Sequence, residues 1–444
     1  MAYPIKIRRR TALCDKRESA ADVDPRSVSH RSPTATAPRT VPLQLLRVPE
    51  ESSDILHSSL RIEHILRAAR DHLGMEIGFI SEFTDGRRVF RHVESFNRKI
   101  CIEVGASDPL EKSYCHWVAK GVLPQLIPDA ADHPFTASFP VTKSLPVGAH
   151  VSVPIRLRGG KVYGTFCCFS TRPDQSLTER DLAVMKAFAQ LAGEQIQRAL
   201  DSEEAWQKKL HRIRTVIESR AVEMVYQPAF RLDEPEIAFF EALARFRSKL
   251  SQPPDQWFAA AAEVGLGVEL EMLAVRLALE GLKALPDSAV VSINVSPQTL
   301  LGTELKEALS SMPLDRIILE ITEHEAVKFY EPVLRALEPL RKHGLRVAVD
   351  DAGAGYASFQ HILRLRPELI KLDMTLSRGI DGDPSRRSLA AALVRFAKEI
   401  GSDLVAEGVE TESELRTLRE LGVNFVQGHL LARPVPAAEL SMAH

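Results

Sequence analysis

The chain has 444 residues, enough for two or three domains at about 150 residues each. Its hydrophobic content of 45% is typical of a globular protein, and its net charge of -2 gives no reason to expect DNA or RNA as a partner. No apolar run approaches the ~20 residues of a membrane span, and the basic N-terminus lacks the apolar segment of a secretory signal.

Residues 1 to about 50 are rich in Ser, Thr, Pro, Ala and Arg and contain few large apolar residues. Such a segment buries too little surface to offset its chain entropy, so we expect it to be disordered. Its basic triplet Arg8-Arg9-Arg10 could touch an anionic surface, but a solvated tail is the simpler interpretation.

The next part of the chain predicts a mixed sheet with a helix at each end. Apolar residues recur at helical spacing over residues 55–72. Two pairs of β-rich segments then flank turn signals at residues 84–86 and 158–160, and each pair predicts a hairpin. A long helix follows, with Thr178 as its N-cap, and continues towards Ile217 and the next domain.

From about residue 221, short β-rich segments alternate with amphipathic helical stretches. Eight such segments in roughly 220 residues predict an α/β fold of the (β/α)8 TIM-like barrel type. The predicted strands cover residues 223–228, 238–246, 289–296, 316–323, 345–351, 368–373, 403–410 and 424–428.

Polar residues lie within or at the ends of these strands: Glu241, Asn294, Glu320, Glu323, Asp350, Asp351, Lys371, Glu407, Glu410 and Gln427. The C-terminal strand ends of a barrel form its catalytic face. Any one acid alone is best explained as a helix cap or turn residue. The whole set would crowd several carboxylates into one mouth, which is costly unless cations neutralise them.

The donor types in this set indicate which cation it would hold. Carboxylates with one amide oxygen, and without Cys or His, select a hard ion such as Mg²⁺ or Mn²⁺. The adjacent Asp350 and Asp351 can serve two such ions, with one carboxylate bridging them. Paired ions of this kind activate a water and stabilise the oxygens of an in-line phosphoryl displacement.

The same residues carry a resemblance to a known family. From about residue 213 to 440 the chain resembles the EAL domain, the bacterial family of cyclic di-GMP phosphodiesterases that act in second-messenger signal transduction. The matching stretches, in family order, are YQP (226–228), EAL (241–243) with Arg245, NVS (294–296), EITE (320–323), DD (350–351), KLD (371–373), AEGVE (406–410) and QG (427–428) with RP (433–434).

This resemblance implies a role for each matched residue in the hydrolysis of cyclic di-GMP to linear pGpG. The catalytic residues would be Glu241, Lys371 and Glu407, with Lys371 positioning the attacking water. The first metal ion would be held by Glu241, Asn294, Glu320 and Asp350, and the second by Asp350, Asp351 and Glu407. The substrate would contact Gln227, Leu243, Arg245, Glu410 and Gln427, and Glu323 would anchor the loop after Asp351.

One stretch departs from the family. The usual DDFGTGYSS is DDAGAGYAS here, with Ala352 and Ala354 in place of Phe and Thr. Because this loop links metal binding to dimer contacts in the family, the change bears on rate and regulation. All the expected metal ligands are present, so we expect activity. The alternatives are a receptor that binds cyclic di-GMP without cutting it, and a pure interaction module.

Residues 55–197 resemble a GAF domain, on the stretches 113–135, 151–170 and 177–196. The resemblance implies a sensor of an unidentified small molecule or a dimerisation module. Residues 198–212 would form a linker or signalling helix that pairs in a homodimer, and the barrel domain would follow from 213 to 444.

The five cysteines lack a CxxC spacing, which suits a reducing cytoplasm and argues against a disulfide framework or a zinc site. The Cys115-His116 pair resembles bilin-attaching GAF domains, but its position does not match theirs. A packed Cys115 is therefore favoured, and a haem or metal role for His116 is not. Cys167 and Cys168 adjoin in a strand and should face opposite sides of the sheet.

Overall fold

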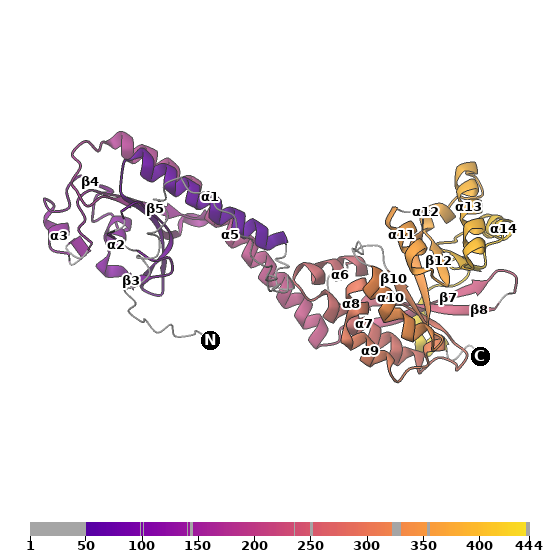
Figure 1. The fold of residues 1–444 in the computed structure, drawn as a ribbon. Coiled ribbons are helices and arrows are strands. Elements are labelled where there is room, and N and C mark those ends of the chain that lie inside the picture. The colour runs from indigo at the N-terminus through magenta and orange to yellow at the C-terminus, as the bar shows by residue number, and fades with distance from the viewer. Residues whose placement is uncertain are drawn as a thin grey trace, which may run out of the picture. The chain divides into compact units, whose positions relative to one another are not determined.

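The computed structural model describes residues 50–440, except for 98, 101, 140, 143–144, 235, 249–251, 322–329 and 353–355. The predicted disordered segment before residue 50 lies outside these residues, as do Glu323 and Ala354. The chain divides into two compact units, residues 1–204 and 205–444. Each is described by itself (Figure 1).

The first unit is built on a six-stranded sheet in the order β3-β2-β1-β6-β5-β4. Every pairing described in this sheet is antiparallel, so the prediction of a mixed sheet is wrong. The reason is the connectivity: two hairpins supply β1–β2 and β5–β6, and β6 then returns alongside β1. Its elements are α1 (Glu50–His72), β1 (Ile77–Thr84), β2 (Arg87–Ser95), β3 (Ser107–Pro109), α2 (Tyr114–Ala119), β4 (Leu126–Ile127), α3 (Pro134–Ala137), β5 (His150–Arg156), β6 (Val162–Phe169) and α5 (Glu179–Glu218).

Both predicted hairpins are confirmed. Asp85 and Gly86 join β1 to β2 with φ of 50° and 70°, the left-handed geometry that matches the twist of a two-residue hairpin. The turn between β5 and β6 contains Gly159 and Gly160, which also have positive φ.

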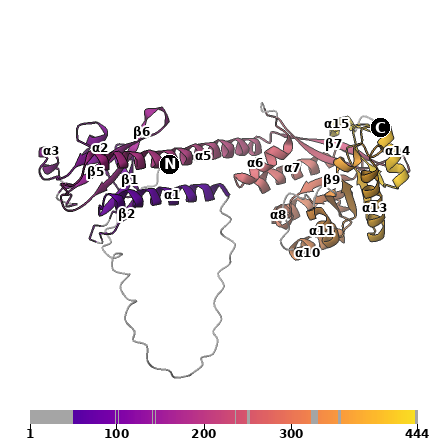
Figure 2. The same cartoon turned by 90° about the horizontal axis from the view of Figure 1, so that it is seen from above.

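Both faces of this sheet are covered. Leu66 of α1 and Met185 of α5 pack on one face, and Tyr114 of α2 packs on the other. Two views show α1 running alongside α5 (Figure 1 and Figure 2). Cys168 lies in the first of these cores and Cys167 in the second, which confirms that adjacent strand residues face opposite sides.

The predicted long helix is confirmed as α5, which has 40 residues. Thr178 immediately precedes it, and its backbone N–H and hydroxyl donate to the Asp181 carboxylate at 2.8 and 2.7 Å. The last turns of α5 belong to the second unit. There Ile213 and Val216 are buried with Val222 and Ala244 in one apolar cluster.

The second unit contains an eight-stranded closed ring in the order β7 to β14, in which β14 pairs back to β7. The short β15 also pairs with β7, antiparallel and at Val225 and Tyr226. The elements are β7 (Val222–Arg231), β8 (Ile237–Phe246), α6 (Pro254–Glu263), α7 (Gly267–Leu282), β9 (Val291–Val295), α8 (Pro297–Leu301), α9 (Thr303–Leu309), β10 (Ile317–Ile321), α10 (Tyr330–Arg341), β11 (Arg346–Ala352), α11 (Tyr356–Leu365), β12 (Leu369–Leu372), α12 (Met374–Ser377), α13 (Pro384–Ile400), β13 (Asp403–Ala406), α14 (Glu412–Leu421), β14 (Phe425–Val426), β15 (Val435–Pro436) and α15 (Ala437–Leu440).

The TIM-like barrel is confirmed with one difference. Strands β8 to β14 run parallel, whereas β7 is antiparallel to both of its ring neighbours. A short connection joins β7 to β8 as a hairpin, so the strict alternation of strand and helix begins only after β8.

The barrel has one core between strands and helices and another inside the ring. Inward-facing residues form the inner cluster: Ala229, Phe239, Ile318, Ala348, Leu369, Val405 and Phe425. Each lies two residues from a polar residue of the predicted site, and this alternation sets the position of the site. None of the described helices is long and apolar enough to cross a membrane.

The contact between α7 and β7 provides a test of this packing. A Cβ added at Gly281 would lie 1.8 Å from the phenol oxygen of Tyr226, which is 1% exposed and donates to the carbonyl of Ala278. Gly281→Ala should therefore lower the free energy of unfolding by about 1–3 kcal/mol, measured by chemical denaturation. Gly382→Ala is the matched control, because its Cβ would have only one neighbour, at 3.9 Å. Equal stability of the two variants would contradict the packing.

Candidate functional site

A layer of polar side chains lies next to the inner apolar cluster of the barrel, two residues further along each parallel strand. Strand side chains alternate with a period of two, so the residue two positions after an inward apolar residue also points inward. On the parallel strands this rule leads from Phe239 to Glu241, and from Ile318 to Glu320. In the same way Ala348 leads to Asp350, Leu369 to Lys371, Val405 to Glu407 and Phe425 to Gln427. On the antiparallel β7 the same layer comes two residues before Ala229, at Gln227.

The ammonium of Lys371 lies at the centre of this polar layer. Its Nζ is 2.5 Å from Glu407 Oε1, 3.0 Å from Glu320 Oε2, 3.2 Å from Glu241 Oε1 and 3.5 Å from Asp350 Oδ1. The Lys371 side chain is 1% exposed. Carboxylates on β8, β10 and β11 and just after β13 therefore converge on one buried cation. The sequence predicts these acids at one mouth, but around metal ions and not around Lys371.

Neutral side chains fix two of the carboxylates from the other side. Gln427 Nε2 donates to Glu241 Oε2 at 2.6 Å and to Gln227 Oε1 at 3.1 Å. Gln227 in turn donates to the carbonyl of Ala432. The hydroxyl of Ser292 donates to Glu320 Oε1. Because both oxygens of Glu241 and of Glu320 are engaged, these side chains are held in one orientation.

The charges in this layer do not balance. One ammonium faces four carboxylates, and burial adds to the cost of ionising them. Burial, together with Glu241 and Asp350, raises the pKa of Glu320 to about 8 although Lys371 opposes the change. Burial and the same neighbours raise the pKa of Glu407 well above its usual range. The surrounding carboxylates, against the effect of burial, raise the pKa of Lys371, which keeps its charge.

Asp350 and Asp351, near the end of β11, differ in backbone conformation and in surroundings. Asp350 faces Lys371, whereas Asp351 has φ of 56° and donates its backbone N–H to Asp350 Oδ1 at 3.0 Å. A non-glycine residue in the left-handed region is uncommon, and here it lies at a register shift between Val349 and Ala352, after which Ala352 pairs with Leu372. Burial, Asp350 and Asp373 raise the pKa of Asp351 to about 6. Asp373 therefore joins this edge of the site.

The remaining predicted residues lie around this layer. Asn294 is half-buried and is in register with Glu320 across β9 and β10. By strand alternation Leu243 and Arg245 share the Glu241 face of β8, and Arg245 is exposed. Glu410 does not join the carboxylates at Lys371, because it pairs with Arg378 at 2.5 Å near the surface.

Sequence reasoning missed Ser292 and Arg378. The signal for Ser292 was present, because it is the inward residue two positions before Asn294 on the same strand. Nothing in the sequence pattern pairs Arg378 with Glu410, since a turn between β12 and α13 brings them together.

The donor types and the excess negative charge of the layer fit hard divalent cations. Within the described ranges, however, no three or more His, Cys, Asp and Glu side chains are arranged so that they could hold a metal ion. The carboxylates close on the Lys371 ammonium instead.

Comparison with known proteins agrees with this architecture. The family model of the EAL domain matches residues 210–434, half of the chain. The chain belongs to the EAL family. A GAF domain model matches residues 62–197, so a GAF domain precedes the EAL domain, as the sequence predicts.

Two curated relatives match mainly through the EAL domain. The cyclic di-GMP phosphodiesterase NbdA of Pseudomonas aeruginosa is 30% identical over 240 residues, 51% of this chain and 31% of that protein. The probable cyclic di-GMP phosphodiesterase PdeA of Escherichia coli is 30% identical over 240 residues, 52% of this chain and 33% of that protein. The chain thus matches about a third of the length of each relative.

One solved structure covers most of the chain. The EAL enzyme Bd1971, in a form bound to cAMP and cyclic-di-GMP, matches with a TM-score of 0.52 and 17% identity. The match covers 83% of this chain and 93% of that one, and it is a likeness of fold.

Replacing the central cation should destabilise the EAL domain. Lys371→Met leaves buried carboxylates without their shared partner, a change that typically costs about 3–5 kcal/mol. Urea unfolding in the presence of a chelator measures this loss at neutral pH. Lys342→Met is the matched control, because Lys342 pairs with Glu338 on an exposed helix surface and should cost less than about 0.5 kcal/mol. A similar loss in both variants would contradict the central role of Lys371.

The raised pKa of Glu320 predicts a pH dependence of stability in the same metal-free protein. Between its ordinary pKa of 4.5 and its pKa of about 8, the folded state holds this proton more tightly than the unfolded chain. The free energy of unfolding should therefore fall as pH rises from 5 to 8, by at most about 1.4 kcal/mol per pH unit for this group. Glu320→Gln has no such proton and should flatten the decrease. An unchanged slope in that variant would contradict the assignment.

Proposed function

We propose that this chain hydrolyses cyclic di-GMP to linear pGpG in a reaction that depends on two divalent cations, Mg²⁺ or Mn²⁺. The observation that carries the proposal is the convergence of Glu241, Glu320, Asp350 and Glu407 on one buried lysine, at the mouth of a barrel of the EAL family. Relatives in this family are named cyclic di-GMP phosphodiesterases, which supports the same substrate here.

The cations would be held by residues that already lie in or beside the polar layer: Glu241, Asn294, Glu320, Asp350, Asp351 and Glu407. When bound, such ions lower the pKa of a water and stabilise the oxygens of the phosphoryl group. Their charge would also offset the surplus of carboxylates, so Glu320 and Glu407 would lose their protons more readily.

The protein side chains have separate tasks in this proposal. Gln427 and Ser292 hold Glu241 and Glu320 in one orientation, which removes the need to order these carboxylates during the reaction. Once the carboxylates bind cations, the ammonium of Lys371 is available to donate to the attacking water. The exposed side chain of Arg245, on the Glu241 face of β8, is suited to bind the phosphate oxygens of the substrate. Leu243 lies between Glu241 and Arg245 on the same face.

We further propose that the GAF domain regulates the reaction and that the chain acts as a homodimer. The support is α5, a single helix whose first turns pack in the GAF core and whose last turns share an apolar cluster with Ala244 of β8. A change in the GAF domain would reach β8 through this helix.

A second candidate is a receptor that binds cyclic di-GMP without cutting it. One observation favours it: the described carboxylates close on Lys371 and form no group arranged to hold a metal ion. The retention of every expected acid and of the lysine favours the enzyme.

The first test is turnover by the full-length protein. With cyclic di-GMP and Mg²⁺ or Mn²⁺, we expect pGpG by chromatography, with loss of activity in excess EDTA and recovery on adding Mn²⁺. Glu241→Ala should lower kcat by about a hundredfold or more, a loss comparable to removing an electrostatic group at a reacting centre. Glu304→Ala is the matched control, because this glutamate pairs with Arg276 at the surface.

The outcomes separate the candidates. Tight binding measured by calorimetry without any pGpG would favour the receptor. Neither binding nor turnover, in a protein with an unchanged melting temperature, would overturn both. Equal activity of Glu241→Ala and Glu304→Ala would contradict the assigned site.

A further inference from the structure

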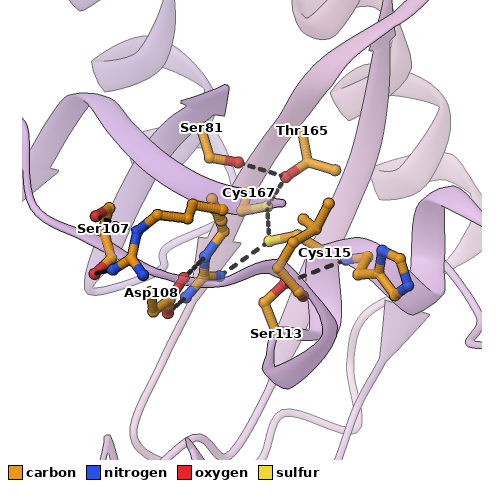
Figure 3. A network of polar contacts seen from close by, with 11 residues as sticks. Ser81, Ser107, Asp108, Ser113, Cys115, Thr165 and Cys167 are labelled. Atoms are coloured by element: carbon orange, nitrogen blue, oxygen red, sulfur yellow. Dashed lines mark hydrogen bonds and ion pairs between the residues drawn. The ribbon is translucent and has the colours of Figure 1, made fainter. Parts of the chain in front are cut away.

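The GAF domain contains two buried thiols in contact with each other. Cys115 on α2 and Cys167 on β6 are both fully buried, and their Sγ atoms are 3.4 Å apart (Figure 3). They are 52 residues apart in the chain, so the contact is made by the packing of α2 on the sheet. A disulfide requires about 2.05 Å between the sulfurs, which a small shift of the two side chains would supply.

The two sulfurs have different partners. The buried guanidinium of Arg88 donates from Nη1 to Cys115 Sγ at 3.1 Å and is held in place by Asp108. Cys167 Sγ lies 3.0 Å from the Ser152 hydroxyl and 3.1 Å from the Thr165 hydroxyl, which is itself bonded to Ser81. Cys115 thus faces a cation, and Cys167 lies among neutral hydroxyls.

These surroundings separate the protonation states. Although burial opposes the change, the hydrogen bond with Cys167 and the charge of Arg88 lower the pKa of Cys115 well below its usual range. Burial and the neighbouring Cys115 raise the pKa of Cys167. These surroundings favour the thiolate form at Cys115 over Cys167.

Arg88, whose guanidinium contacts Cys115, also lines a small cavity. The cavity is lined by Arg88, Tyr114, His150 and several apolar side chains, and its volume is about 20 Å³. Burial and Arg88 lower the pKa of His150 to about 3, so this imidazole is neutral and Arg88 provides the charge. A volume of this size holds a molecule about as small as water, and hydrogen peroxide is among the smallest oxidants.

We propose that Cys115 and Cys167 form a peroxide-reactive pair that closes to a reversible disulfide inside the GAF domain. The Cys115 thiolate attacks one peroxide oxygen, the O–O bond breaks, and the hydroxide released takes up a proton to become water. The sulfenic acid formed on Cys115 then reacts with the Cys167 thiol, forming the S–S bond and releasing a second water. In total two thiols are oxidised by two electrons and one hydrogen peroxide is reduced to two waters.

Cys168 is the internal control. It is also fully buried, but it faces the other core, and burial raises its pKa above the usual range. Its backbone neighbours Cys167, so any difference in reactivity arises from the side-chain surroundings. Oxidation should therefore consume Cys115 and Cys167 and spare Cys168.

The test is peptide mapping of the reduced full-length protein after a few equivalents of hydrogen peroxide. Free thiols are blocked with N-ethylmaleimide before digestion with trypsin, and cross-linked peptides are identified by mass spectrometry. Cys167 and Cys168 share a tryptic peptide, so fragmentation of this peptide and the Cys168→Ala variant assign the link. We expect a Cys115–Cys167 link in both proteins, lost after dithiothreitol.

The single variants assign the two roles. In Cys167→Ala, Cys115 should accumulate as a sulfenic acid that a dimedone probe labels, and in Cys115→Ala, Cys167 should stay reduced. Melting temperatures identify the variants that fold, and the mapping of the unaltered protein tests the proposal without them. Bulky tert-butyl hydroperoxide should react at least tenfold more slowly than hydrogen peroxide.

Several results would overturn the proposal. These are an unaltered protein whose Cys115 and Cys167 stay reduced after excess peroxide, a link that involves Cys168 instead, and oxidation of Cys167 at the same rate in Cys115→Ala. Equal rates with the two peroxides would contradict the cavity as the path of entry. Each of the first three results would rule out Cys115 as the thiolate that forms the link with Cys167.

Discussion

The site depends on the attraction between one buried ammonium and the carboxylates around it. Lys371 comes from β12, near the middle of the parallel run of strands, and reaches acids on β8, β10 and β11 and at the end of β13. Burying such charges is expensive, and the cost is recovered only when each has several partners. Gln427 and Ser292 supply those additional partners. Glu241 and Glu320 are therefore each held in one orientation by the protein itself.

Much of this layer could be predicted from the sequence because the period of a strand is fixed. Once the strands are recognised, an inward Phe239 or Ile318 requires that Glu241 or Glu320 point inward as well. The parallel connections then bring these positions to one end of the ring. Local pattern and global fold agree here, which explains why residues scattered over about two hundred positions could be assigned to one mouth.

Other features depend on information that local patterns lack. The direction of β7 follows from how the ring closes, and no spacing within that strand specifies it. The left-handed backbone of Asp351 arises at a register shift within β11, and the pairing of Glu410 with Arg378 arises in connections between elements. In the GAF domain, a packed Cys115 is expected because its position does not match that of a bilin-attaching cysteine, but its contact with Cys167 and Arg88 needs the packing of a helix on a sheet.

The reversed direction of β7 determines at which rim the polypeptide enters the barrel. Because Val222 pairs with Phe246, the first residue of β7 lies at the C-terminal end of β8, the end towards which the mouth opens. A parallel first strand of the same 10 residues would have entered at the opposite rim, roughly 33 Å away. The C-terminal end of α5 is thereby placed at the rim towards which the polar layer of the barrel opens. Displacing it by a single turn would disturb the neighbours of Arg245 directly, with no need for a signal to cross the barrel.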